Sequence, residues 1–389
     1  MNNRVTLICE SFLPERTAGS NRALSIINTL LLSDYQVTVC FLMPLGCASQ
    51  DYIFPNELKC FTNLKLIPVT RKIYNKSNLL FRLMNETMQA KKLISKSLEV
   101  DSDTIIISTP MLMLLPVAAW YLKNAKVHTI LEVRDLIWRY YEFKTGLLSY
   151  LISEVLTKIS IYSINKFDDV VTVTHSQREW LVSKTKTNVI AIENGIDLNT
   201  LQKLSTVNKG ALLDDSIIYA GSIGYPQNIS TLVEAVYLLQ NKGVIIRLTI
   251  VGNGPEFDKV SELIEKRKLL NARVIPAVKF EQLSEEYSNH KILYGQLRNI
   301  PSLETAVPTK VFEYLAMSKP IIFGLKGEAK DILLKFEGVV VVEPDKPQEL
   351  AEAILKQISN NVFKGNNYNQ LHSNYLRENL ISKYKDLIC

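Results

Sequence analysis

The chain has 389 residues, a length that exceeds one hydrophobic core and suits two domains. Apolar residues make up 47% of it and charged residues 22%, which excludes wholesale disorder. The formal net charge of +6 suits an anionic ligand or a membrane surface, but it is too small and too scattered to indicate nucleic-acid binding.

The first half of the chain alternates strands with helices. Residues 5–9 form a continuous apolar run, as in a parallel strand covered on both faces, and apolar residues between 23 and 31 keep the helical period. Further strands are predicted at residues 36–42, 104–108, 127–132 and 170–174. This alternation is typical of an open parallel sheet with helices on both faces.

The second half repeats this rhythm after a short strand at 190–197 and a polar stretch at 199–210, the candidate connection between domains. Strands are predicted at 216–220, 245–251, 272–275, 320–323 and 338–342, and helices at 229–239, 256–269, 309–317 and 347–358. We therefore expect two Rossmann-like α/β domains, residues 1–200 and 201–370. The remaining residues, 371–389, are predicted to contain one helix at 371–387 that packs back on the first domain.

Several segments weigh against other classes of protein. The uncharged stretch at 105–122 contains Pro110 and Pro116, which favours a buried strand, a turn and a short helix over a membrane span. Because Met1 leads almost directly into a strand, we expect no signal peptide. The histidines lie far apart, so no metal site is expected. The cysteines lack C-x-x-C spacing and are expected to be reduced thiols in the cytoplasm: Cys9, Cys40, Cys47, Cys60 and Cys389.

Two glycine clusters each follow a predicted strand and precede a helix. They are Gly221-Ser222-Ile-Gly224 and Gly252-Asn-Gly254. Glycine lets backbone amides approach a phosphate or a sugar, and a helix N-terminus adds positive partial charge. Strand-to-helix turns need glycine in any case, so neither cluster alone specifies a ligand. Neither is the G-x-G-x-x-G of a first strand, which argues against a nicotinamide or flavin dehydrogenase.

A third motif, Pro308-Thr309-Lys310-Val-Phe-Glu313-Tyr-Leu-Ala-Met317, is more specific. Thr309 can cap a short helix, and Lys310 and Glu313 share one helical face. This arrangement places a cation at a helix N-terminus, where it suits a diphosphate, and a carboxylate one turn on that could hold a diol. The alternative is an ordinary surface ion pair.

In order and spacing, the three motifs resemble the donor-binding half of retaining GT-B glycosyltransferases of family GT4. Ile192-Glu-Asn-Gly-Ile-Asp197 is similar to that family's domain junction, and the loop with Gly19, Ser20 and Arg22 is similar to its glycine-containing first loop. The resemblance implies two Rossmann-like domains that face each other across a cleft, with a nucleotide sugar bound by the C-terminal half.

The resemblance also implies roles for single residues. Glu313 would hold the ribose hydroxyls, Lys310 and nearby amides would meet the diphosphate, and Gly254 and the backbone of 275–278 would lie along the nucleoside. Asp135 occupies the slot where the family often has His-Asp near the transferred sugar. The implied donor-binding residues are Gly19, Gly221, Ser222, Gly224, Gly254, Val278, Arg298, Thr309, Lys310 and Glu313, and the implied catalytic residues are Arg134 and Asp135.

Three features depart from the family pattern. Many members carry an Arg and a Lys for the diphosphate where this chain has Ser222 and Gln227, a loss that Arg298 and Lys310 can offset. Thr305 stands where the E-x7-E pattern needs a glutamate, which bears on sugar recognition or on the chemistry itself. Arg134 replaces the usual His. With Asp135 it resembles a bacterial branch that includes L-fucosamine-type transferases of surface-polysaccharide assembly.

The implied reaction is retaining transfer from a UDP-linked sugar, such as an N-acetylated amino or deoxyamino sugar, to a lipid-linked or oligosaccharide acceptor in O-antigen or capsule synthesis. No cofactor beyond the nucleotide sugar is expected, so cations and helix-terminal amides would stabilise the leaving diphosphate. Asp101-Ser-Asp103 spells a metal-binding D-x-D pattern, but its place before a strand predicts a solvated loop. Two alternatives remain: a nucleotide-sugar epimerase of the same fold, and a non-catalytic nucleotide-sugar-binding partner.

Two segments bear on contact with an anionic membrane at the inner face of the cell membrane. Apolar residues from Leu148 to Ile159 repeat at helical spacing, and they form either core or a face toward the bilayer. Upstream lies a basic region that is either a solvated face or a contact with lipid headgroups. It comprises Arg71, Lys72, Lys76, Arg82, Lys91, Lys92 and Lys96.

Overall fold

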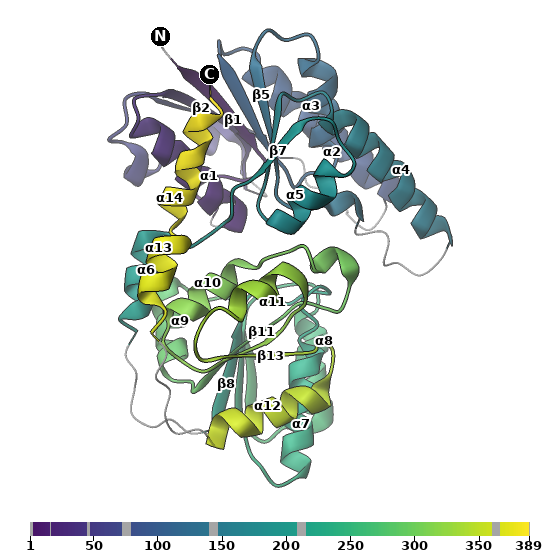
Figure 1. Cartoon of the computed structure of the whole chain (residues 1–389), viewed down its shortest axis with the longest axis vertical. Coiled ribbons are helices and arrows are strands. Elements are labelled where there is room, and N and C mark those ends of the chain that lie inside the picture. Colours follow the sequence, from purple (N-terminus) through teal and green to yellow (C-terminus); the bar gives the residue numbers. More distant parts are fainter. Residues whose placement is uncertain are drawn as a thin grey trace. The chain divides into compact units, whose positions relative to one another are not determined.

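The computed structural model describes residues 3–15, 17–44, 47–71, 79–139, 147–207, 215–359 and 366–388. The chain divides into two compact units (Figure 1). Unit 1 comprises residues 1–194 and 377–389, and unit 2 comprises residues 195–376. Each unit contains one parallel sheet with helices on both faces, as the alternation of strands and helices predicts.

Unit 1 is built on a seven-stranded sheet in the order β3-β2-β1-β4-β5-β6-β7. Its strands are β1 Arg4–Cys9, β2 Gln36–Leu42, β3 Leu64–Val69, β4 Thr104–Ser108, β5 His128–Val133, β6 Asp169–Thr172 and β7 Asn188–Ala191. Its α-helices are α1 Ala18–Leu31, α2 Leu79–Ser97, α3 Leu114–Leu122, α4 Leu147–Ile164, α5 His175–Val182 and α14 Arg377–Ile381. Helices α1 and α14 share the apolar core on one face of the sheet, and α2, α3 and α4 share the core on the other (Figure 1).

Unit 2 is built on a six-stranded sheet in the order β10-β9-β8-β11-β12-β13. Its strands are β8 Ser216–Ala220, β9 Arg247–Val251, β10 Ala272–Ile275, β11 Ile292–Gln296, β12 Ile321–Gly324 and β13 Val339–Val342. Its α-helices are α6 Leu198–Ser205, α7 Ser230–Asn241, α8 Phe257–Arg267, α9 Phe280–Ser288, α10 Thr309–Ala316, α11 Gly327–Leu333, α12 Pro347–Ser359 and α13 Tyr368–Asn374. The order of the strands along the sheet reverses between β8 and β11, and we call this place the switch point. In open parallel sheets, ligands bind at the carboxyl edge of the switch point.

Two predicted segments differ from the structure. The polar stretch at 199–210 is largely α6, because Asp197 caps the helix by accepting a hydrogen bond from the amide of Thr200 (2.9 Å) and because Leu201 and Leu204 are buried. Residues 208–210 lie outside the described part. The single helix predicted at 371–387 is wrong. The chain leaves α13 at Tyr375, whose ring packs on Phe312 and Phe336, so tertiary contacts override the helical period.

After this break the chain returns to unit 1 as α14 and a 3-10 turn at Ser382–Asp386. Leu380, Ile381 and Tyr384 are buried in the core that α1 forms on the sheet. Residues 377–388 therefore complete one face of unit 1.

A buried ion pair lies beneath this segment. Nε of Arg22 in α1 lies 2.7 Å from Oε1 of Glu132 in β5, and both side chains are almost completely buried. The guanidinium also donates to the carbonyls of Ile192 (2.8 Å) and Glu193 (3.0 Å), and the hydroxyl of Tyr384 donates to Glu132 (2.5 Å). Burial raises the pKa of Glu132, but the charges of Arg22 and Arg134 and the hydrogen bonds from Ser108 and Tyr384 together outweigh it, so the pKa lies below its ordinary value and the pair stays ionised.

We predict that Tyr384→Phe lowers the free energy of unfolding of unit 1 by about 1.5–3 kcal/mol, because a hydrogen bond to a buried charged group is lost. Urea denaturation followed by circular dichroism measures the change. Tyr150→Phe is the matched control, since Tyr150 on α4 is half exposed. Equal stability of the two variants would show that the Tyr384 hydroxyl contributes nothing.

Candidate donor site and its neighbours

The predicted donor residues of unit 2 lie on loops at the carboxyl edge of its sheet. The loops after β8 and β9 are joined by backbone hydrogen bonds, from Gly221 to Val251 (2.9 Å) and from Ile223 to Asn253 (2.9 Å). Gly254 has a φ of +155°, and a Cβ there would lie 2.2 Å from the carbonyl oxygen of Ile223. This close approach alone requires glycine at position 254.

The segment after β10 joins the same group of loops. The side-chain oxygen of Asn253 accepts a hydrogen bond from the amide of Ala277 (3.1 Å), next to the half-buried Val278. The predicted base-binding segment is therefore fixed to the loop that carries Gly254.

Arg298, in the loop after β11, lies against the loop after β8. Its amide donates to the carbonyl of Pro226 (2.7 Å) and its Nε donates to the carbonyl of Tyr225 (3.0 Å). The guanidinium carbon lies 4.1 Å from the centroid of the Tyr225 ring. A permanent cation is thus held next to the Gly221–Gly224 loop, at the point between β8 and β11 where the winding of the sheet reverses.

A polar network fixes these two loops. Gln296 donates to the carbonyls of Gln227 and Asn228 (both 3.1 Å). Asp345 accepts from the Asn228 side chain (2.6 Å) and from the amide of Asn299 (2.8 Å). The loops after β8, β11 and β13 are thereby held together at the switch point.

Helix α10 carries the predicted phosphate and ribose contacts. The prediction that Thr309 caps this helix is wrong: Pro308 is the N-cap residue and Thr309 is the first helical residue. Pro308 has a φ of −61° and a ψ of 141°, the extended conformation of a residue before a helix, and its ring provides no capping oxygen. Within the described residues, the amides of Thr309 and Lys310 have no acceptor, so two donors remain at the helix N-terminus.

Lys310 and Glu313 form the ion pair that their spacing allows. Nζ of Lys310 lies 2.5 Å from Oε2 of Glu313 and 3.2 Å from the Tyr287 hydroxyl, and the two charged side chains are each 27% exposed. Burial lowers the pKa of Lys310, but the charge and hydrogen bond of Glu313, together with the nearby hydroxyls of Tyr314 and Tyr219, outweigh burial and the pKa is raised. Lys310 is therefore a positioned cation throughout the neutral range.

A buried tyrosine ties α10 to the glycine loop. The amide of Ala220, the last residue of β8, donates to the Tyr314 hydroxyl (3.1 Å), and the Tyr314 ring meets the Tyr287 ring edge-on at 5.8 Å. Gly221 follows Ala220 directly, so the predicted phosphate-binding loop and α10 are brought together. Tyr314 lies within the third motif, but no role for it was predicted; its place one residue after Glu313 is the signal that could have indicated one.

The positions that depart from the family pattern take part in local structure. The carbonyl of Ser222 accepts from the Tyr219 hydroxyl (2.6 Å), and that of Gln227 accepts from Gln296. The hydroxyl of Thr305 donates to the carbonyl of Ser302 (2.9 Å) in the loop before α10.

The predicted residues of unit 1 form a separate group. A Cβ on Gly19 would overlap the guanidinium of Arg134, so this arginine packs directly on the first turn of α1. Its carbonyl accepts from Gln177 (3.2 Å), and its Nε is buried without a hydrogen-bond partner among the described residues. Asp135 follows and is half buried. Gly19, Arg134 and Asp135 thus cluster at the carboxyl edge of the unit 1 sheet.

Other candidate sites have structural explanations. Arg4 forms ion pairs with Asp101 and Asp103 of the D-x-D pattern, and its hydrogen bonds lower the pKa of Asp103 to about 2. Across the described ranges there is no cluster of His, Cys, Asp or Glu that could hold a metal, and no helix long and apolar enough to cross a membrane.

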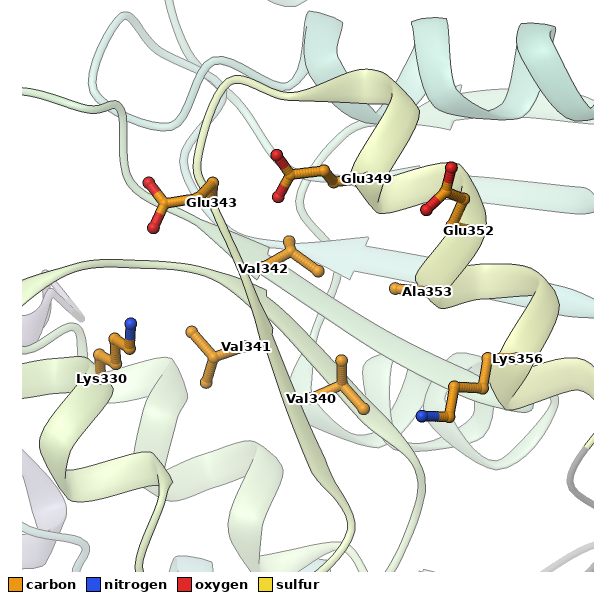
Figure 2. Close-up of a pocket in the computed structure, with 9 residues that line it drawn as sticks. All are labelled: Lys330, Val340, Val341, Val342, Glu343, Glu349, Glu352, Ala353 and Lys356. Atoms are coloured by element: carbon orange, nitrogen blue, oxygen red, sulfur yellow. The ribbon is translucent and has the colours of Figure 1, made fainter.

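Figure 2 shows a groove of about 380 Å³ beside β13 in unit 2. Apolar Val340, Val341 and Val342 form its floor, and charged side chains of α11 and α12 surround it, including Lys330 and Glu349. None of the predicted donor residues lines this groove, so it is separate from the loops described above.

Residues 209–377 match the family described as "Glycosyl transferases group 1". The matched residues make up most of unit 2, which is therefore similar to this family. The chain is also 21% identical over 199 residues to an uncharacterised glycosyltransferase of Methanocaldococcus jannaschii, an alignment that covers 51% of this chain and 52% of that protein. It is 23% identical over 274 residues to an Escherichia coli protein provisionally named as the colanic acid biosynthesis glycosyl transferase WcaI, with 65% of each chain covered. The matches thus span about half to two thirds of these relatives.

Solved structures match along nearly the whole chain. Sucrose-phosphate synthase from Thermosynechococcus elongatus has a TM-score of 0.76 at 13% identity, with 99% of this chain and 98% of that chain covered. The Anabaena protein Alr3699/HepE, in complex with UDP and glucose, has a TM-score of 0.69 at 13% identity with the same coverage. These likenesses confirm the predicted fold class, two parallel-sheet α/β domains of the GT-B type.

We predict that Gly254→Ala destabilises unit 2 more than Gly243→Ala. Both positions have positive φ, +155° and +81°, but a Cβ at 243 meets nothing within 4 Å whereas one at 254 overlaps the Ile223 carbonyl. Comparing the two variants therefore separates the cost of steric overlap from the cost of backbone strain, which alone is about 1–3 kcal/mol. Thermal unfolding measures the difference, and equal losses would contradict the role assigned to Gly254.

Proposed function

We propose that the chain is a retaining glycosyltransferase that moves a sugar from a UDP-linked donor, such as an N-acetylated amino or deoxyamino sugar, to a lipid-linked or oligosaccharide acceptor in bacterial surface-polysaccharide synthesis. The observation that carries the proposal is the docking of α10 against the glycine loop of β8. It sets the Lys310 cation, two free helix amides and the Glu313 carboxylate beside the switch point of the unit 2 sheet.

These groups suit a nucleoside diphosphate. Lys310, Arg298 and the amides of α10 would stabilise the negative charge that develops on the leaving diphosphate, and Glu313 would accept hydrogen bonds from the ribose hydroxyls. Arg298 takes the place of the basic residues absent at Ser222 and Gln227. In unit 1, Gly19 is assigned to the diphosphate, and Arg134 and Asp135 are the proposed catalytic residues.

The relatives support the substrate classes. One solved structure of similar fold holds UDP and glucose, and one curated relative is provisionally named for colanic acid biosynthesis. A peripheral contact with an anionic membrane would bring the enzyme to a lipid-linked acceptor. Helix α2 supports such a contact, because it exposes Leu80, Phe81 and Met84 in its first turns and Lys91 and Lys92 further along.

The other residues of the predicted basic region either lie close to a carboxylate or lie outside the described residues. Arg71 lies close to Glu10, Arg82 pairs with Glu86, and Lys96 pairs with Glu99. Lys72 and Lys76 lie outside the described residues.

We expect Glu313→Gln to weaken UDP binding about tenfold to a hundredfold, the effect of losing hydrogen bonds to a charged group. Isothermal titration with UDP and with uridine separates two roles: Glu313→Gln should weaken both ligands, whereas Lys310→Met should weaken UDP more than uridine. Glu349→Gln, on the distant α12, is the control. Unchanged UDP affinity in Glu313→Gln would overturn the donor-site assignment.

We expect UDP release from a UDP-sugar to depend on a lipid-linked oligosaccharide. A sugar isomerised without acceptor would instead indicate the epimerase, and tight binding without turnover would indicate a non-catalytic partner. A thermal-shift screen of nucleotide sugars selects the donor for this assay, because the true donor stabilises the fold by mass action.

A further inference from the structure

Unit 1 has a charged groove on the side of the sheet covered by α2, α3 and α4, separate from Gly19, Arg134 and Asp135. It lies between α4 and α5 and has a volume of about 580 Å³. Three cations, one carboxylate and two aromatic rings determine its chemistry: Arg139, Lys158, Lys184, Glu154, Tyr162 and Trp180. Its lining therefore carries a net positive charge.

Cations in and next to this groove lie over its aromatic rings. The Arg139 guanidinium lies 5.1 Å from the centroid of the Trp180 ring. Nζ of Lys166, at the end of α4, lies 4.9 Å from the centroid of the Tyr162 ring. In the described part of the chain, no carboxylate lies within 4 Å of Lys158 or Lys184. Both ammonium groups are thus available to an anion.

Next to the groove, α4 exposes an apolar stripe. Leu151 is 51% exposed, Val155 56%, Ile159 45% and Tyr162 68%. Their spacing of four, four and three residues places them along one side of the helix, and Tyr162 belongs to both the stripe and the groove. The stripe predicted from the sequence therefore serves two purposes. Leu156 belongs to the core and Ile152 packs against the core, whereas the other described members are exposed: Leu151, Val155 and Ile159. The side chain of Leu148 is outside the described set.

The neighbouring helices also expose apolar side chains. Helix α3 packs between α2 and α4 and exposes Trp120 and Tyr121, and α2 exposes the apolar residues named above. Isolated exposed apolar side chains are ordinary, but rows of them on three adjacent helices mark a surface for a membrane or a partner. The rings of tyrosine and tryptophan favour the boundary between headgroups and acyl chains.

We propose that the groove between α4 and α5 binds the phosphate of an anionic phospholipid headgroup while the α4 stripe enters the interface of the bilayer. A phosphate matches the net positive lining of the groove, and the acyl chains of the same lipid match the stripe that begins at Tyr162. This inference rests on the membrane contact proposed above and makes it specific to one site. It is independent of the donor site in unit 2.

The test is sedimentation of the full chain with phosphatidylcholine vesicles, with and without phosphatidylglycerol. Binding should require phosphatidylglycerol. The double variant Lys158→Glu/Lys184→Glu should reduce it more than tenfold, since each cation near an anionic surface strengthens binding roughly fivefold. Lys242→Glu/Lys266→Glu, at exposed lysines of unit 2, makes the same change in net charge and should leave binding within twofold of the unchanged chain. Val155→Asp should also weaken binding, without loss of thermal stability because the side chain is exposed.

Other outcomes overturn the proposal in distinguishable ways. If Lys91→Glu/Lys92→Glu abolishes binding and the groove variant does not, the membrane contact exists but α2 makes it. If soluble glycerol 3-phosphate binds the groove and vesicles do not, the site takes a free phosphate. If vesicles never bind but Val155→Asp turns a dimer into a monomer, a second copy covers the stripe. UDP affinity, measured in parallel, should be unchanged in every variant and reports separately on the proposed enzyme.

Discussion

The arrangement of unit 1 depends on the ion pair between Arg22 and Glu132. Two buried charges are costly unless each is paired and hydrogen-bonded, and removing one partner of such a pair typically costs about 3–5 kcal/mol. Here the donors and acceptors come from α1, from the end of β5, from the residues after β7 and from the terminal segment. One electrostatic requirement therefore fixes four separate pieces of chain at the carboxyl edge of the sheet. Arg134 and Asp135 lie two and three residues after Glu132, so the proposed catalytic pair begins close to a fixed point.

Unit 2 achieves the corresponding order with hydrogen bonds rather than with a buried ion pair. The Tyr314 hydroxyl and the side chains of Gln296 and Asp345 hold the loops around the switch point, so the charged residues Lys310, Glu313 and Arg298 are held at the surface of a rigid edge. A ligand that arrives there meets donors already in place, which is the condition for electrostatic stabilisation of a leaving group.

The sequence predicted most of this architecture, and the exceptions have physical reasons. Strands β2, β4, β8 and β10 match their predicted limits. In β4 and β8 the reason is a continuous apolar run, which marks a buried parallel strand. β11 was not predicted because Gly295 and Gln296 interrupt its apolar character, and β3 was not predicted because it contains a lysine and Pro68. The donor motifs could be grouped in advance, since the carboxyl ends of parallel strands share one edge. The Arg22–Glu132 pair could not, because 110 positions separate its members and no local pattern joins them.

The discontinuous make-up of unit 1 has a consequence for synthesis of the chain. Residues 195–376 are contiguous and can fold as soon as they leave the ribosome, whereas unit 1 lacks Leu380, Ile381 and Tyr384 until unit 2 has been made. Until then the core between α1 and the sheet lacks these three side chains, and Glu132 lacks the Tyr384 hydroxyl. Part of the apolar surface of the nascent first unit therefore stays exposed while the second unit is translated, which makes this stage prone to aggregation.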